Sequence, residues 1–320
     1  MKLCLFQGNH SMRFCGLKFK TISFVAFLIL SENLMSQTFN IGRTLLSMID
    51  SERGNRKVQV EVYYPAGTSG ENVPVCSAGS MKFPVLCFAH GYLMPWDSYT
   101  YIRDALVQQG FIIAFPKTEG DLFPSHADLA GDIIFTLRKI SEYGGDNRSI
   151  FFKSIQQKNC VMGHSMGGGS AVLAAESDSS IDALAVLAPA DTRPSAIKAA
   201  ASVRIPALII SGGNDCITPP EKHQIPIFNA LQSFSKLLIT IKGGSHCQMA
   251  DKSFPCNLAE FTCGPDPSIS SEEQQRVVIR YLVSWLNYSL KGDSSSIKQL
   301  GSMIGSDTGV IVEKGKSFIF

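Results

Sequence analysis

The sequence lacks any cluster of basic residues: its 29 lysine and arginine side chains are interspersed with 27 acidic ones, and the net charge is +2 at pH 7. Proteins that bind nucleic acid present a basic face or stripe, so this composition argues against a nucleic-acid partner. No apolar run reaches the roughly 20 residues that a membrane-spanning helix needs, and we find no internal repeat. The 45% hydrophobic and 18% charged residues over 320 positions are typical of a globular protein with one large α/β domain or two small ones.

The N-terminus has the composition of a secretory leader. Arg13, Lys18 and Lys20 precede an apolar stretch over residues 22–30, and Ser36 provides a small residue after it. A basic region, a short apolar core and a small residue at the cleavage site are typical of a signal peptide. We therefore predict a signal peptide over residues 1–36 and a secreted protein, extracellular or periplasmic. An uncleaved anchor or a buried segment is the alternative.

Seven cysteines remain after this cleavage, because Cys4 and Cys15 leave with the leader. Export permits disulfides. Cys87 and Cys160 fall in predicted buried strands and are expected to be core thiols, and Cys76 is left over. The disulfide candidates lie in loops of the C-terminal half and are Cys216, Cys247, Cys256 and Cys263.

The spacing of these four cysteines leaves three pairings open. We favour Cys216 with Cys247 and Cys256 with Cys263, because the first pair would join two loops that are expected to meet. A zinc site is the competing interpretation, although the spacings match no familiar pattern of zinc ligands.

Apolar runs typical of strands alternate with helical patterns along the chain. Runs at 41–49 and 58–64 flank a polar turn and predict an antiparallel hairpin at a sheet edge. Buried strands are expected at 83–89, 111–115, 160–162, 183–188, 206–211 and 237–241, and helices at 97–109, 125–143, 166–176, 220–234 and 270–290. This alternation predicts an α/β fold: a doubly wound, mainly parallel sheet with helices on both faces.

We expect one catalytic domain over residues 37–292. Beyond it the composition shifts to Gly-Asp-Ser-Ser-Ser, which indicates a linker. Residues 293–320 are therefore expected to be a linker and a C-terminal tail, with one short strand pattern at 310–312.

The most informative stretch is 158–176, which contains Gly163-His-Ser-Met-Gly167. A G-x-S-x-G motif between a strand and a helix places the serine on a sharp, strained turn, so that its hydroxyl projects clear of the sheet. Glycines two residues before and after keep side chains out of the tight space between strand and helix. We therefore predict that Ser165 is a nucleophile. A glycine-rich turn without catalytic function is the alternative.

A serine nucleophile needs a base, and the base needs a group that orients it. In sheets of this kind both come from loops at the carboxyl ends of later strands, in the order serine, acid, histidine. Asp215 follows the strand at 206–211, and His246 follows the strand at 237–241. The sequence therefore predicts a catalytic triad of Ser165, Asp215 and His246, which requires no metal and no organic cofactor.

Other residues compete for these roles. Asp191 follows the strand at 183–188 and is expected to be a loop-capping residue or a substrate contact rather than the triad acid. His223 is expected near the surface, His164 is expected to pack at the turn beside the serine, and His126 begins a helix. His246 is therefore the preferred base.

The oxyanion hole needs two N–H donors, which we assign to the backbone of Met166 and Tyr92. Gly91 lets the loop before Tyr92 turn toward the serine. The predicted substrate cleft adds Leu93, Met94, Trp96, His164 and Asp191, and the side chains of Tyr92 and Met166 would line it too. An apolar, aromatic cleft suits the acyl or aromatic part of an ester. The alternative for Trp96 is packing against the following helix.

The motif from Gly163 to Gly169, with Asn214-Asp215 and Ser245-His246, resembles the α/β-hydrolase superfamily. Within it, the sequence is similar to the bacterial cutinase and polyester-hydrolase group and to the dienelactone-hydrolase-like and chlorophyllase-like esterases. The resemblance covers roughly residues 43–290. It implies an α/β-hydrolase fold and a secreted serine carboxylesterase that forms an acyl-enzyme on small-molecule or polymeric esters. We expect a monomer.

Two loops depart from the polyester hydrolases of this group. Residues 189–194 lack the tryptophan usual there, and the loop after His246 is long and carries three cysteines. Neither difference argues against general ester hydrolysis. Two further hypotheses remain: another acyl-transfer activity on the same triad, such as a lipase, thioesterase, peptidase or chlorophyllase-like enzyme, or a binding protein without catalytic activity.

Overall fold

The structure, a computed structural model, describes residues 38–76, 81–251 and 253–315. The predicted signal peptide lies outside these residues. Residues 38–320 form one unit. Within the described ranges, no helix combines the length and the apolar composition required to cross a bilayer.

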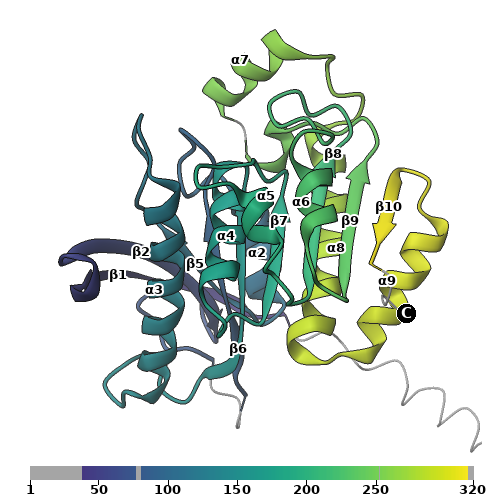
Figure 1. Cartoon of the computed structure of the whole chain (residues 1–320). Helices are drawn as coiled ribbons and strands as arrows, with labels where there is room; N and C mark the ends of the chain where they lie inside the picture. The colour runs from purple at the N-terminus through teal and green to yellow at the C-terminus, as the bar shows by residue number, and fades with distance from the viewer. Residues whose placement is uncertain (1–37, 77–80, 252, 316–320) are drawn as a thin grey trace, which may run out of the picture. The chain divides into compact units, whose positions relative to one another are not determined.

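A single sheet organises this unit (Figure 1). In the described residues it has ten strands, in the order β10-β9-β8-β7-β6-β4-β5-β2-β1-β3. The strands are β1 (Asn40–Asp50), β2 (Arg56–Ala66), β3 (Gly70–Glu71), β4 (Phe83–Ala89), β5 (Ile112–Pro116), β6 (Ile155–His164), β7 (Ala183–Leu187), β8 (Ala207–Gly212), β9 (Lys236–Ile241) and β10 (Val310–Lys314). Every strand predicted from an apolar run is present, within a few residues of its expected bounds, except that β6 begins well before residue 160.

The centre of the sheet is parallel, and antiparallel pairs join the flanking strands to it. Strands β5, β4, β6, β7, β8 and β9 pair in parallel. The predicted hairpin of β1 and β2 joins this block antiparallel through β5, and β10 joins it antiparallel through β9. Because the carboxyl ends of parallel strands meet at one edge, the loops after β4, β6, β8 and β9 converge on one rim of the sheet.

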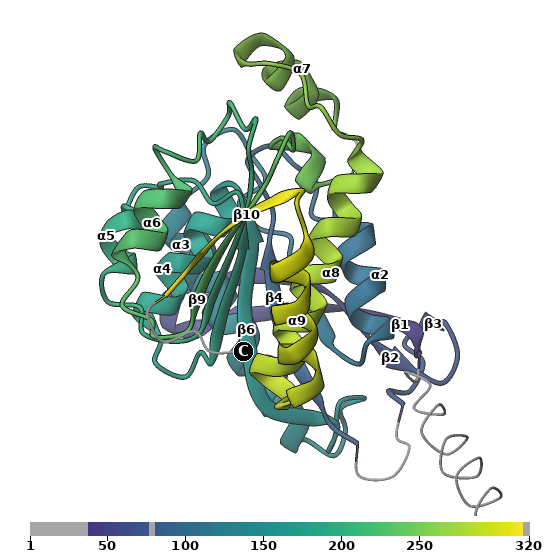
Figure 2. The ribbon, with the colours of Figure 1, turned by 90° about the vertical axis from the view of Figure 1, so that its right-hand side faces the viewer.

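Helices cover both faces, as the alternation of strands and helices predicts (Figure 2). The side chains of β4 alternate between the two cores: Val85 and Cys87 pack on one side, Leu86 and Phe88 on the other. A strand that is buried on both faces needs an unbroken apolar run, which is what the sequence provides. One face carries α3 (His126–Gly145), α4 (Met166–Ser177), α5 (Ala196–Ala200) and α6 (Gln224–Ala230); the other carries α2 (Thr100–Gln108), α8 (Ser271–Lys291) and α9 (Ser294–Ser306).

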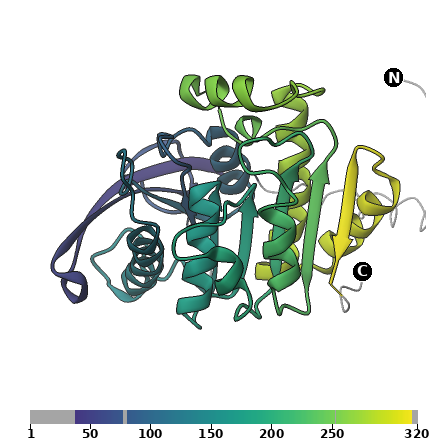
Figure 3. The ribbon, with the colours of Figure 1, turned by 45° about the horizontal axis from the view of Figure 1, so that its top comes forward.

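Several boundaries correct the sequence predictions. The predicted linker is wrong, because the residues after Asp293 form α9, which Asp293 caps through its side chain. The strand pattern at 310–312 belongs to β10, so the tail docks on the sheet. Helix α6 is shorter than predicted, α2 begins three residues later, and α5 and α7 (Phe254–Cys263) were not predicted. Figure 3 shows α7 beyond the strand ends, apart from the two helical layers.

A buried ion-pair network ties the hairpin to α3. The carboxylate of Asp132, which is fully buried, accepts hydrogen bonds from Arg53 (2.6 Å) and from two nitrogens of Arg56 (both 2.8 Å). It also accepts from the hydroxyl of Thr118 at 2.5 Å, and the carbonyl of Thr118 contacts His90 Nε2 at 2.8 Å. The network therefore reaches the loop that begins at Gly91.

Asp132→Asn is expected to lower the free energy of unfolding by about 2 kcal/mol, the scale of hydrogen bonds to charged groups, because it removes the buried anion shared by Arg53 and Arg56 while each keeps one other carboxylate, Asp50 or Glu119. Urea denaturation followed by circular dichroism measures this effect. Glu71→Gln is the matched control: it removes the partner of Arg43 in a pair exposed to solvent on both sides, where about 0–1 kcal/mol is typical. Equal losses in both variants would contradict the interpretation.

Candidate active site

Ser165 lies on the turn between β6 and α4 with φ +56° and ψ −120°. This positive φ is strained for a residue with a side chain, as expected for a serine held at an elbow. The turn is fixed from both sides: the N–H of Ser165 donates to the carbonyl of Leu187 (3.0 Å), and its carbonyl accepts from Gly169 (3.0 Å) and Ala190 (2.9 Å). The strain is therefore imposed by the ends of β6 and β7 and by the first turn of α4.

Glycine is required at the two motif positions because backbone atoms approach too closely for a side chain. A Cβ at Gly163 would meet the backbone of Gly167 at less than 3.0 Å, and a Cβ at Gly167 would meet the carbonyl of Ala89 equally closely. Glycine at both positions was predicted for this steric reason. The backbone contact with Ala89 also brings the end of β4 against the start of α4.

The acid and base candidates meet at the same rim. Asp215 follows β8 and His246 follows β9, both are buried, and the Nδ1 of His246 lies 2.8 Å from Oδ2 of Asp215. A proton on Nδ1 donates to the carboxylate, so Nε2 is left as the acceptor. This is the tautomer that a general base for a serine hydroxyl requires.

Thr218 holds the carboxylate of Asp215, and Gln224 in turn holds Thr218. Neither residue was predicted from the sequence. The N–H of Thr218 donates to Oδ1 of Asp215 (2.7 Å), and its hydroxyl lies 2.9 Å from Oδ2 and 3.0 Å from Nδ1 of His246. Gln224, fully buried, donates to the carbonyl of Thr218 at 2.9 Å and to its hydroxyl oxygen at 3.1 Å. Both carboxylate oxygens are therefore fixed before any substrate binds.

His164 lies behind this pair. Its ring centroid is 4.6 Å from that of His246, and its Nδ1 is 3.1 Å from the hydroxyl of Tyr99, which also accepts from the N–H of Gly91 at 2.9 Å. Burial lowers the pKa of His164 well below its usual value, so the ring is neutral. His164 directly precedes Ser165 in the chain, so the ring contact brings the residue before the candidate nucleophile against His246. The hydrogen bond between Ser165 and His246 stays a prediction.

The competing residues have other partners. The carboxylate of Asp191 accepts from the hydroxyl of Ser195 (2.8 Å) and from the N–H of Ile197 (3.1 Å) at the start of α5, which is the capping role that the sequence suggested. The N–H of Asp191 donates to Nδ1 of His223 at 2.9 Å. His126 accepts at 3.2 Å from the N–H of Arg193. The structure thus assigns the contact with His246 to Asp215 among the aspartates considered.

The predicted oxyanion donors lie on suitable elements. Met166 is the first residue of α4, where N–H groups have no partner within the helix. Tyr92 lies in the loop after β4, where the N–H of Met94 closes a turn by donating to the carbonyl of Gly91 (3.1 Å). The side chain of Tyr92 is about half exposed, and its hydroxyl donates to the carbonyl of Leu122 at 3.0 Å. The role of both backbone groups as oxyanion donors stays a prediction.

The predicted cleft residues differ in exposure. His164, Met94 and Met166 are buried, as Ser165 and His246 are, and their contact with a substrate stays a prediction. Trp96 is half-buried and packs on Phe115 of β5 with Lys117 over its ring, and its role in a substrate cleft stays a prediction. Exposed apolar side chains in the loops after β4 and β5 are those of Tyr92, Leu93, Leu122 and Phe123. The last two were not predicted.

Two disulfides connect the triad loops to α7, and they correct the predicted pairing. Cys216 pairs with Cys263, and Cys247 pairs with Cys256. The four cysteines were identified, but the favoured partners are wrong, because the triad loops bridge to a common helix rather than to each other. Cys87 and Cys160 are buried thiols as predicted, and burial raises the pKa of both.

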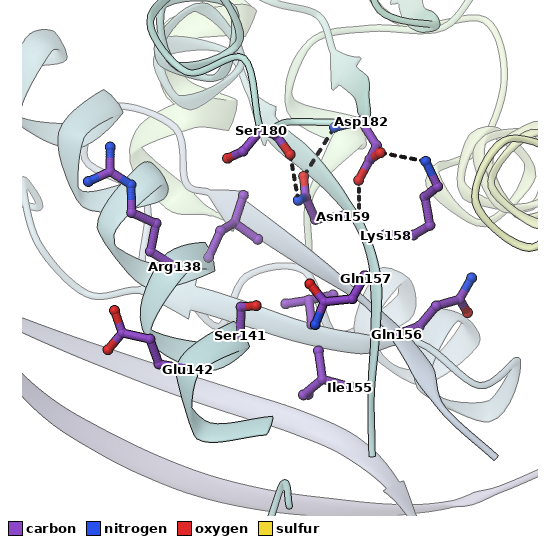
Figure 4. A pocket seen from close by; sticks show the side chains of 12 residues that line it. Arg138, Ser141, Glu142, Ile155, Gln156, Gln157, Lys158, Asn159, Ser180 and Asp182 are labelled. Carbon is purple, nitrogen blue, oxygen red and sulfur yellow. Dashed lines mark hydrogen bonds and ion pairs between the residues drawn. The ribbon is translucent and has the colours of Figure 1, made fainter. Parts of the chain in front are cut away.

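A separate hollow of about 390 Å³ lies at the amino-terminal half of β6, against α3 (Figure 4). Its polar groups are engaged with one another: Asp182 contacts Lys158 Nζ at 2.6 Å and the N–H of Asn159 at 2.9 Å. Ser165 follows the other end of the strand, so this hollow is not part of the candidate active site.

Comparisons with known proteins agree with this geometry. The family model described as PET hydrolase-like matches residues 36–295. A bis(hydroxyethyl) terephthalate hydrolase of Streptomyces coelicolor is 24% identical over 234 residues, which are 73% of this chain and 62% of that protein. Cutinase 2 of Thermobifida cellulosilytica is 38% identical over 167 residues, 51% of this chain and 60% of that protein. Cutinase cut1 of Thermobifida fusca is also 38% identical, over 51% of this chain and 50% of its own length. The chain thus covers between half and two thirds of the length of these relatives.

Proposed function

Because this chain belongs to the PET hydrolase-like family, we propose that it is a secreted serine hydrolase that cleaves carboxylic esters of the kind taken by cutinases and polyester hydrolases. The observation that carries the proposal is the 2.8 Å contact between His246 and Asp215, and the strained turn of Ser165 supports it. The relatives' names, a cutinase and a bis(hydroxyethyl) terephthalate hydrolase, support esters of bulky or aromatic acids as substrates.

The proposed reaction has two steps. His246 Nε2 takes the proton of the Ser165 hydroxyl while Oγ attacks the ester carbonyl carbon, and the oxyanion accepts from the N–H groups of Met166 and Tyr92. The tetrahedral species collapses, the carbon–oxygen bond to the alcohol breaks, and His246 returns the proton to the leaving alkoxide. Water then attacks the acyl-enzyme with His246 again as base, releasing the acid and restoring the Ser165 hydroxyl. Asp215 keeps Nδ1 protonated throughout.

A substrate panel on the disulfide-bonded protein tests this function. We expect turnover of p-nitrophenyl butyrate and of bis(hydroxyethyl) terephthalate, much slower cleavage of a matched amide, and a serine-directed phosphonate attached to the Ser165 peptide by mass spectrometry. A polyester film added to the panel determines whether polymers are taken. Faster cleavage of a thioester than of every ester would favour another acyl-transfer activity, and absence of both turnover and labelling would favour a binding protein.

A further inference from the structure

Helix α7 contacts the active site through a single buried side chain. Glu260 is the one buried residue of α7 and is 7% exposed. Its Oε1 accepts from the N–H of His246 (2.7 Å) and of Cys247 (3.2 Å), and its Oε2 accepts from the hydroxyl of Ser245 (2.9 Å). A carboxylate is therefore aimed at the backbone of the candidate base and of the residue after it, and at the hydroxyl of the residue before it.

Apolar packing does not account for the position of α7. Its large apolar side chains Phe254, Leu258 and Phe261 are 80%, 52% and 75% exposed. At about 100° per residue, Cys256, Glu260 and Cys263 lie on the opposite face of the helix. That inner face carries both half-cystines and the carboxylate, so α7 is held by two covalent bonds and a set of hydrogen bonds.

The disulfides attach this face to the residues that directly follow the acid and the base. Cys263 is bonded to Cys216, next to Asp215, and Cys256 is bonded to Cys247, next to His246. Position 264 lies so close to Cys216 that a Cβ there would meet its side chain at less than 3.0 Å. Glu260 is thus held between two anchors, one on each triad loop.

We propose that Glu260 is a positioning residue for His246, and that α7 is a disulfide-anchored brace that presents it. The proposal rests on the role of His246 proposed above. The Glu260 carboxylate fixes the backbone from which the imidazole projects. The N–H of Ser245 donates to the side-chain oxygen of Gln274, and the side-chain amide of Gln274 donates to the carbonyl of Ser245, at 2.8 Å each. The negative charge of Glu260 also favours the imidazolium that forms when His246 takes the serine proton.

The charged and titratable groups around His246 come from four elements. Asp215 contacts the ring, Glu260 contacts the backbone, His164 stacks on the ring, and His223 is close enough to interact electrostatically. Both carboxylates favour positive charge on the imidazole, whereas the two histidines oppose it. Removing the charge of Glu260 alone should therefore destabilise the imidazolium that forms during the reaction and lower kcat.

The test compares Glu260→Gln with the parent protein and with Glu313→Gln, an exposed control on β10. For Glu260→Gln we expect a kcat about 10-fold lower with little change in KM, since misplaced catalytic groups cost rate rather than binding. We also expect the ring resonances of His246 to move, followed by NMR of ¹³C-labelled histidine, because the backbone that carries the ring loses its anchor, and the control should match the parent. Glu260→Asp, which keeps the charge, should restore part of kcat. A variant that melts earlier but keeps the parent ring resonances and kcat would overturn the proposal.

Two further arms keep the test decisive. If Glu260→Gln does not fold, the double variant Cys256→Ser with Cys263→Ser releases α7 instead, and parental His246 ring resonances and kcat in that folded variant would equally overturn the proposal. The NMR comparison does not depend on turnover. A parent protein that cleaves no ester would therefore refute the proposed function while the ring resonances still decide the role of Glu260.

Discussion

Ser165→Ala is expected to lower kcat for p-nitrophenyl butyrate by about 10⁶-fold, the scale seen when a triad nucleophile is removed, without loss of the fold. The hydroxyl makes no capping hydrogen bond to α4, and alanine adopts the same positive φ at a similar cost, so its removal breaks nothing that holds the turn. Thermal melting and steady-state turnover of the same preparation measure the two effects.

Ser170→Ala is the matched control for that variant. Ser170 lies on the same helix, is fully buried, and its hydroxyl has no hydrogen-bond partner among the residues described. Removing an unsatisfied buried hydroxyl costs little stability, and activity should stay near that of the parent. A well-folded Ser165→Ala protein that still turned over ester at a rate similar to this control would remove Ser165 from the mechanism.

Asp215→Asn is expected to lower kcat by about 10⁴-fold, the cost of an acid-to-amide change that leaves a triad geometry intact. Oδ2 of Asp215 accepts from Nδ1 of His246 and lies in reach of the Thr218 hydroxyl. An amide group at that position can donate to Nδ1 and so stabilise the tautomer with its proton on Nε2, which cannot accept the proton of Ser165. Steady-state kinetics, with the ring tautomer assigned by ¹⁵N NMR, measures both parts.

Asp191→Asn separates this effect from the loss of any carboxylate near the rim. The carboxylate of Asp191 accepts from Ser195 and Ile197 at the start of α5, and an asparagine oxygen can accept in the same place, so stability should change little and activity should fall far less than in Asp215→Asn. A larger kinetic loss in Asp191→Asn than in Asp215→Asn would reverse the assignment of the acid.

Local patterns predicted the strands and the turn of Ser165 because each depends on neighbouring residues. A strand buried on both faces needs a continuous apolar run, and Phe83–Ala89 provides one. The turn needs glycine at 163 and 167 for reasons of backbone distance. The order of Ser165, Asp215 and His246 followed from the parallel sheet, since the loops at its carboxyl edge must converge.

The sequence could not supply what depends on contacts between distant loops. Four cysteines permit three pairings at any spacing, and only the placement of α7 selects Cys216 with Cys263. Thr218 and Glu260 carry no local motif, since hydroxyl and carboxylate side chains are common in loops and on exposed helices. The linker prediction failed for a different reason: the serine-rich start of α9 masked a helical spacing of Ile297 and Leu300, both of which are buried.

The antiparallel strand at the C-terminal side of the sheet has a consequence for recombinant production. Strand β10 pairs with β9 from Val310 opposite Ile241 to Lys314 opposite Leu237, so it covers the backbone of an apolar segment rich in leucine and isoleucine. A version shortened before residue 310 would keep Ser165, Asp215 and His246 and would expose that backbone as a template for another molecule. Solubility at high concentration therefore depends on a strand that takes no part in the chemistry.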